Sequence, residues 1–265
     1  MFFILKENKR FFKQILKLSK SELIKTYKGA ALGPMWALIK PVVHIFVFWF
    51  AIELGLRSGR NIHDFPFVIF LMVGIIPWFF IQDAILDGAN SIRRNNHFVT
   101  KMPFPVSTVM TFVTLSKIYV HIGLTAIVYI ILLILGYAPS VYNLQIFFYM
   151  PMMYIFFTCL TWITAPLSCI SKDFINAIKS IITAIFWLSG IIWDTYSLPK
   201  GLLKKVILLN PVNYIVNGYR NTFLYNKWFF ESPYELAGFL ACFIAVVILG
   251  SLVYKRLMKR ILDVI

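Results

Sequence analysis

The chain has 265 residues, of which 60% are hydrophobic and only 14% are charged, and its mean hydropathy is +0.77. A soluble domain has about half apolar and about a quarter charged residues, so this composition excludes a soluble protein and indicates a polytopic membrane protein. The net charge of +15 does not require a nucleic-acid partner, because Lys and Arg collect in the cytoplasmic loops of membrane proteins.

Residues 1–28 predict an amphipathic helix that lies in the membrane surface. Lysines recur on one helical face, while Phe12, Leu16 and neighbouring apolar side chains form a broad second face. Such a helix either only anchors the chain or also borders a docking surface for a cytoplasmic partner. The interfacial residues expected to matter are Lys13, Lys17, Lys20 and Tyr27.

Six apolar runs are comparable with the stretch of about 20 residues that crosses a bilayer. They cover residues 34–56, 66–86, 106–135, 145–170, 174–193 and 234–254. Pro77 and Pro166 are expected to kink or interrupt their helices. The expected fold is an all-α integral membrane protein with a single domain. It comprises an interfacial helix at 1–28, a six-helix membrane part at 34–254 and a cytoplasmic tail at 255–265.

The distribution of basic residues predicts the orientation. Residues 1–33 hold eight Lys and Arg, and the loops and tail expected on the same side hold more than the opposite loops do. By the positive-inside rule, both termini face the cytoplasm. The segment 196–230 is an exception, because it is basic although it is expected outside.

Two connections between spans have unusual patterns. In residues 87–105, Asn90 or Ser91 is expected to cap a short polar helix, which either inserts into a groove on a soluble partner or is an ordinary interfacial loop. In residues 194–232, a helix is expected to start near Pro211. It is too short and too polar to span the membrane, so a re-entrant or surface-lying helix is expected.

No catalytic or metal-binding motif is found. The sequence lacks GxxxxGK[ST], HExxH and GxSxG, and its three cysteines lie in apolar segments without metal-ligand spacing. Ionisable side chains within spans are costly and should face the bundle interior or a pore. Rings and cations are therefore assigned to a substrate path, although lipid headgroup contact explains the outer cations equally well. The substrate-path candidates are Trp36, Lys40, His44, Trp49, Arg57, Tyr219 and Arg220.

Short motifs in a fixed order resemble the permease subunits of type-2 ABC exporters for cell-surface polymers, and most closely the wall teichoic acid permeases. They include Tyr27-Lys28, Phe48-Trp49-Phe50, Trp78-Phe79-Phe80, Asn210-Pro211-Val212 and Tyr219-Arg220. One departure is Lys40, at a position where the family commonly has Asn. It places a charge near the expected inner mouth.

The resemblance implies a half-transporter in the plasma membrane of a bacterium. Two copies would pair with two ABC ATPase subunits, which bind ATP and Mg, while this chain holds no cofactor. The substrate implied is a lipid-linked, phosphate-rich polymer, and the segment around 210–230 resembles an exit gate. The implied ATPase-coupling residues are Asn90, Ser91, Ile92, Arg93, Arg94, Asn95, Asn96, His97, Phe98, Lys172 and Asp173.

Three alternatives remain at this stage. The closest is a permease for another lipid-linked polysaccharide, such as O-antigen or capsule. A membrane-embedded transferase would need a convergent set of carboxylates, histidines or metal ligands, whereas the acidic residues are spread over both sides. An ion channel would need a filter-like loop, which the sequence lacks.

Overall fold

The computed structural model describes residues 2–51, 61–100 and 104–264, and within these ranges the chain is helical without β-strands. Four helices are long and apolar enough to cross a membrane. They are α4 (Phe67–Arg94), α6 (Val106–Ile134), the continuous stretch Val141–Ile170 that contains α7 (Ile146–Ile170), and Pro233–Met258 of α11 (Pro233–Val264). Two shorter helices, α3 (Trp36–Trp49) and α8 (Lys172–Leu188), stand at the positions of the first and fifth predicted spans.

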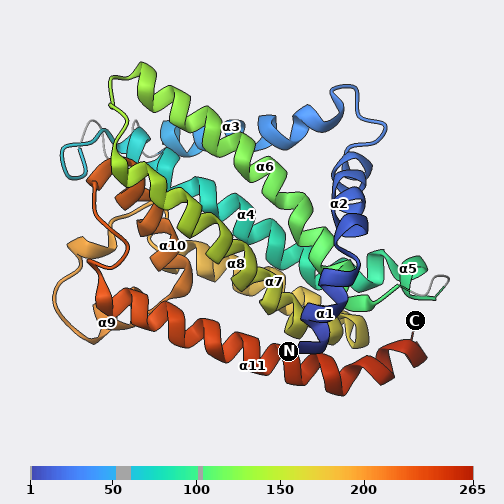
Figure 1. The fold of residues 1–265 in the computed structure, drawn as a ribbon. Helices are drawn as coiled ribbons and strands as arrows, with labels where there is room; N and C mark the ends of the chain where they lie inside the picture. The colour runs from blue at the N-terminus through green and yellow to red at the C-terminus, as the bar shows by residue number, and fades with distance from the viewer. Residues whose placement is uncertain (1, 52–60, 101–103, 265) are drawn as a thin grey trace.

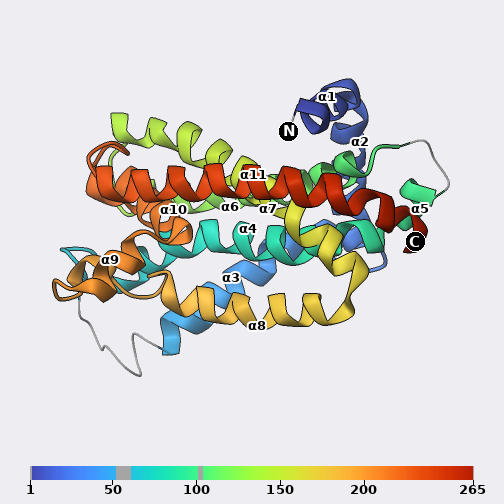
Figure 2. The ribbon, with the colours of Figure 1, turned by 90° about the horizontal axis from the view of Figure 1, so that it is seen from below.

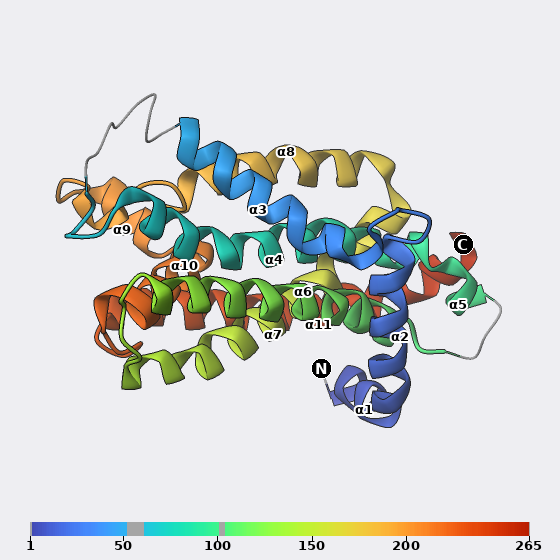
Figure 3. The ribbon, with the colours of Figure 1, turned by 90° about the horizontal axis from the view of Figure 1, so that it is seen from above.

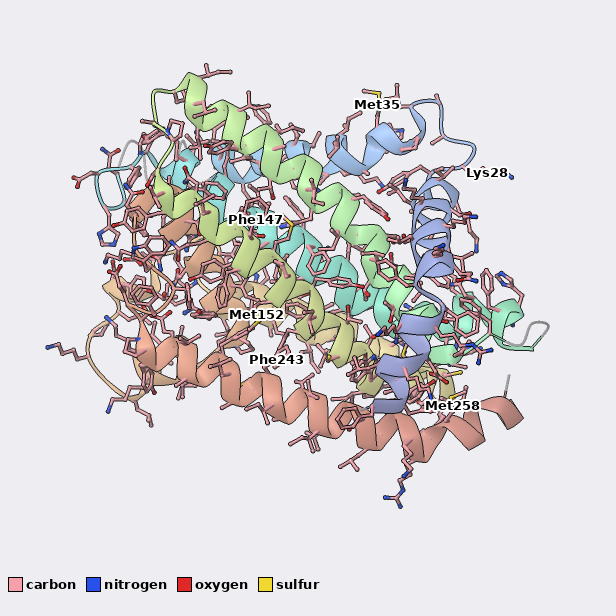
Figure 4. All side chains as sticks on the ribbon, in the orientation of Figure 1. Lys28, Met35, Phe147, Met152, Phe243 and Met258 are labelled. Atoms are coloured by element: carbon pink, nitrogen blue, oxygen red, sulfur yellow. The ribbon has the colours of Figure 1, made fainter. Side chains whose placement is uncertain are left out.

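Helix α4 is the centre of the bundle. It packs against α6, α7, α8 and α3, and most of its side chains are buried. Figures 1 and 2 show that α4, α6, α7 and α11 run along a common direction. Figures 2 and 3 place α3 and α8 on the same side of α4. Figure 4 shows how densely side chains fill the space between α7 and α11, where Met152 and Phe243 pack against the main core.

The two ends of the bundle differ. Helices α2 (Phe12–Thr26) and α5 (Asn96–Thr100) and the C-terminus lie at one end, and α2 runs across this end and not along the bundle (Figures 1 and 3). The opposite end is built from short elements. They are η3 (Val141–Gln145), η4 (Thr195–Ser197), α9 (Leu202–Leu208), α10 (Pro211–Arg220) and the π-helical turn Asn221–Tyr225.

The N-terminal segment is two helices rather than the single one expected. Helix α1 (Phe2–Arg10) ends at Phe11, whose ring packs edge-on against Phe104 at 5.3 Å between centroids. Helix α2 buries Ile15, Ser19 and Glu22 against the bundle, mainly against α6. These three positions share one helical face, while Lys13, Lys17 and Lys20 are exposed on another.

The expected break before the polar loop is shifted along the chain. Helix α4 continues without interruption to Arg94, and the short helix α5 begins only at Asn96. Asn90 does not cap it, because its side chain donates instead to the carbonyl of Leu86 one turn earlier. The helices also run unbroken through Pro77 and Pro166, so neither proline interrupts its helix.

Residues 194–232 contain the short helix expected to start near Pro211. Asn210 caps α10 by accepting a hydrogen bond from the N–H of Val212 at 2.9 Å, and Pro211 occupies the first turn. From Val212 to Arg220 every residue of α10 is buried, so this helix lies inside the fold. A short helix at this position was expected, and its re-entrant or surface-lying position relative to the membrane stays a prediction.

A polar cluster holds the loop that follows α8. Asp194 accepts hydrogen bonds from Ser197, from the N–H of Tyr196 at 3.0 Å, and is 2.9 Å from the ring of His63. Burial acts to raise the pKa of Asp194, but these contacts favour its charged form and together lower the pKa. The cluster therefore keeps a charged carboxylate at the end of the bundle opposite α2.

Candidate functional site

A cavity of about 330 Å³ lies between α3, α4, α6 and α8. Its wall combines ionisable side chains with aromatic rings, drawn from segments that are far apart in the sequence. The polar lining residues are Tyr27, Lys40, His44, Gln82, Asp83, Lys117, His121 and Thr183, and the rings include Phe48, Trp78, Phe79, Phe80 and Phe186.

Helices α3 and α8 close one side of this cavity through ring contacts. Phe186 of α8 packs against Phe48 of α3 at 5.5 Å and against Trp78 of α4 at 5.4 Å between ring centroids. The opposite faces of α3 and α8 expose large apolar side chains, including Phe46 and Trp187. The cavity therefore lies behind two amphipathic helices whose outer faces have no partner within the described part of this chain.

The cations on the wall have different surroundings. Lys40 lies with its ammonium 5.7 Å from the centroid of the Tyr27 ring, and within the described residues no carboxylate is in ion-pair distance of it. Lys117 is largely buried and pairs with Asp87. A cavity with cations and stacking rings can hold an anionic group beside a sugar or another flat apolar face.

His121, on the cavity wall, shares a hydrogen bond of 2.5 Å with the hydroxyl of Tyr219 behind it. Tyr219 is fully buried and does not itself line the cavity. Its neighbour Arg220 is also fully buried, and its side chain contacts the turn after α8. Helix α10 is thus joined to the cavity through one histidine.

Arg220 binds backbone carbonyls instead of a carboxylate. Its guanidinium donates to the carbonyls of Gly190 at 2.7 Å and Ile191 at 2.6 Å and stacks on the ring of Phe70 at 3.5 Å. Gly74 leaves room for this group, since a Cβ there would lie 2.8 Å from Cζ of Arg220. Arg220 therefore ties the turn after α8 to α4 and α10.

A chain of ion pairs connects α2 with the cavity. Lys25 lies 4.0 Å from Glu22, Glu22 pairs with Arg94, Arg94 lies 3.3 Å from Asp87, and Asp87 pairs with Lys117. Glu22 and Asp87 each use one oxygen for one neighbour and the second oxygen for the other. The signs alternate along the chain, so each charge in the interior of the network has opposite charges on both sides.

The predicted coupling residues lie together at the end of the bundle that contains α2 and α5. Arg93 donates to the carbonyls of Ser168 at 2.5 Å and Cys169 at 3.0 Å, in the last turn of α7. A cation there satisfies carbonyls that the helix leaves unpaired. This contact places the end of α4 beside the turn that carries the exposed Lys172 and Asp173.

Within the predicted coupling segment, exposure divides the residues into two groups. Ser91, Ile92 and Asn95 are buried, whereas Arg94, Asn96 and His97 are exposed, and Arg93 and Phe98 are half-buried. The exposed set can meet a partner directly, and the buried set can only hold the segment in place. Asn90 is half-buried and bonds within its own helix.

The residues predicted to line a substrate path lie in three different places. Lys40 and His44 line the cavity, Trp36 and Trp49 are half-buried on α3 outside it, and Tyr219 and Arg220 lie in the interior. Arg57 falls outside the described residues.

The network members Glu22 and Asp87 were not singled out from sequence as functional. The spacing of Asp83 and Asp87 by four residues, which places both on one face of α4, was the available signal.

Comparison with known proteins defines the class. A family model described as ABC-2 type transporter matches residues 13–224, and the chain belongs to this family. The O-antigen export system permease protein RfbA of Myxococcus xanthus is 23% identical over 211 residues, covering 79% of each chain. The polysialic acid transport protein KpsM of Escherichia coli is 25% identical over 199 residues, covering 70% of this chain and 71% of the relative.

Family membership and the four long apolar helices agree with the composition. The protein is an integral membrane protein of a bacterial membrane.

Proposed function

We propose that this chain is the membrane half of an ATP-driven exporter that carries a lipid-linked cell-surface polysaccharide from the inner to the outer leaflet. The observation that carries the proposal is the cavity in which Lys40 and Lys117 lie among aromatic rings, close to the end of the bundle that holds the coupling residues. Cations suit a phosphate linkage, and rings suit sugars that pass without tight binding. The names of both relatives support the polysaccharide class.

The proposed assembly contains two copies of this chain and two ABC ATPase subunits, which bind ATP and Mg. The unpartnered apolar faces of α3 and α8 support pairing with a second copy and their role as the first and fifth of six membrane spans. The exposed residues at the end of α4, in α5 and at the turn before α8 form the proposed ATPase contact. Export is driven when closure of the ATPase dimer pushes on this contact.

Helix α2 is proposed to lie in the inner membrane surface. Around its axis, Phe12 and Leu16 are exposed between the buried face and the lysine face. Apolar side chains there reach the acyl region while lysines reach anionic headgroups. Figure 4 shows Lys28, which follows α2, at the edge of the molecule, as expected for a headgroup contact.

Two classes of exported polymer fit this proposal. The order of the sequence motifs favours wall teichoic acid, whereas the names of the relatives, O-antigen export and polysialic acid transport, favour the alternative of another lipid-linked polysaccharide. A lipid diphosphate linkage is common to both readings, so the cations of the cavity do not separate them. Competition between a polyol-phosphate oligomer and a phosphate-free oligosaccharide on the same lipid would separate them.

The function is tested by purifying the chain with its partner ATPase and measuring ATP hydrolysis in lipid nanodiscs. We expect the two proteins to purify together and hydrolysis to rise when a lipid-linked oligosaccharide is added, because the loaded cavity favours the conformation that the ATPase drives. A stable complex whose hydrolysis ignores every lipid-linked substrate would contradict the proposal.

The orientation is tested separately with a His97→Cys variant. His97 is exposed on α5, so a membrane-impermeant maleimide should label it only from the cytosolic side. Lys200→Cys, at an exposed position at the opposite end, should react only from outside and serves as the matched control. Among the native cysteines, Cys159 and Cys169 are buried, and Cys242 is replaced by Ala to remove background. Labelling of His97→Cys from outside would reverse the proposed topology.

A further inference from the structure

The ion-pair network ends at the cavity. Lys117 lines the cavity and is at the same time the last member of the chain that starts on α2. The cavity is therefore in electrostatic contact with the end of α4 and with the interfacial helix. The proposed transport role alone does not require such a connection.

The carboxylates around Lys117 are placed for exchange. Asp83 and Asp87 are four residues apart on α4, so they lie on one face, one turn apart. Asp83 is exposed on the cavity wall. Asp87 pairs with Lys117 and also contacts Arg94, so it belongs to the ion-pair network. A lysine ammonium on a flexible stem can turn between partners one helical turn apart.

Release of Lys117 would not leave Asp87 alone. The second carboxylate oxygen of Asp87 is 3.3 Å from Arg94, and this contact remains when Lys117 turns away. Stranding a charge without a partner is the main cost of breaking such a pair, and Arg94 avoids it. The free-energy cost of breaking the Asp87–Lys117 pair is therefore small for Asp87.

The same exchange changes the charge of the cavity. While Asp87 holds Lys117, the remaining charges on the wall are Lys40 and Asp83, which are opposite in sign. The two histidines on the wall, His44 and His121, add no charge when neutral. Once Lys117 turns inward, the wall has two cations against one carboxylate, which favours an anionic group.

We propose that Asp87 and Lys117 form an exchangeable ion pair. When an anionic phosphate in the cavity draws Lys117 away, Asp87 keeps Arg94 as its partner and attracts it more strongly relative to Glu22, which transmits the change to the coupling segment and α2. This inference rests on the proposed function and assigns a regulatory role to the same cavity. The ligand class is a lipid-linked diphosphate. Asp87 and Arg94 are positioning residues, and Lys117 is the group that meets the phosphate.

The experiment measures ATP hydrolysis by the permease–ATPase complex in nanodiscs as polyprenyl diphosphate is added. Polyprenol, which has no charge, and inorganic diphosphate, which has no lipid, separate the two parts of the ligand. Lys117→Met should raise the half-stimulating concentration of polyprenyl diphosphate by about tenfold, because the cation is lost. Asp87→Asn should lower it by about three- to tenfold, because Lys117 no longer has a competing partner.

The opposite directions of the two shifts are the decisive result. A purely structural role for the pair would weaken stimulation in both variants, and shifts in the same direction would overturn the inference. Lys200→Met, at an exposed position far from the cavity, is the matched control and should leave the curve unchanged. Lys117→Gln and Asp87→Ser carry the same comparison if either first variant fails to assemble. If the wild-type complex ignores every lipid-linked substrate, the proposed function fails instead.

Discussion

Arg220→Met is expected to prevent the end of the bundle that contains α10 from folding. The arginine is fully buried, and its loss leaves the carbonyls of Gly190 and Ile191 without donors in the interior. Each unpaired buried carbonyl costs about 1–3 kcal/mol, so the two together are expected to cost about 2–6 kcal/mol. The yield of monodisperse protein after size-exclusion chromatography should fall sharply, and the detergent-solubilised remainder should unfold at a lower temperature.

Arg220→Lys separates charge from geometry. A lysine retains the cation but cannot span several carbonyls while stacking on Phe70, so its yield should lie between those of wild type and Arg220→Met. Arg256→Met, at an exposed position on α11, is the matched control and should behave as wild type. A monodisperse Arg220→Met variant with an unchanged unfolding temperature would show that the carbonyl contacts contribute little.

Arg94→Met should release α2 from the bundle. Glu22 is only 4% exposed, and without Arg94 its nearest cation is Lys25 at 4.0 Å. A buried carboxylate that loses its main partner costs about 3 kcal/mol, which exceeds what a short helix on the surface is expected to recover elsewhere. Trypsin should therefore cleave after the exposed Lys28 many times faster than in wild type, and less ATPase should remain bound on purification.

The double variant Glu22→Leu/Arg94→Met tests this cause. Removing both partners leaves no stranded charge, so resistance to trypsin should partly return. Lys25→Met is the control, because Lys25 is 53% exposed and a pair of that kind contributes about 0–1 kcal/mol. If the double variant is cleaved as fast as Arg94→Met, the buried charge is not the reason for the release.

Much of the helical framework could be predicted from the sequence. Helices are present at all six expected apolar runs, because uninterrupted apolar stretches are a strong signal in a membrane protein. Four of them satisfy the length and composition of a membrane span, while α3 and α8 are shorter. The break at Phe11, whose ring packs against Phe104, could not be foreseen, since no proline or glycine marks this position in the sequence.

The candidate site was predicted only in part. Intramembrane ionisable residues were expected to face the interior or a pore, and Lys40, His44 and Lys117 do line one cavity. The partners of Lys117 could not be derived, because they depend on the register between α4 and α6. Glu22 gave no signal within a lysine-rich helix. Its importance arises from burial, which a single sequence does not reveal.

The contacts of Arg220 have a consequence for acid tolerance. Peptide carbonyls neither gain nor lose protons in the range that a cell meets, and an arginine stays charged throughout it. Asp194 in the same region has a lowered pKa, so the stabilisation from its charge persists well below neutrality and is lost only as the pH falls through that lowered value. The end of the bundle opposite α2 should thus keep its structure when the surrounding medium is acidified.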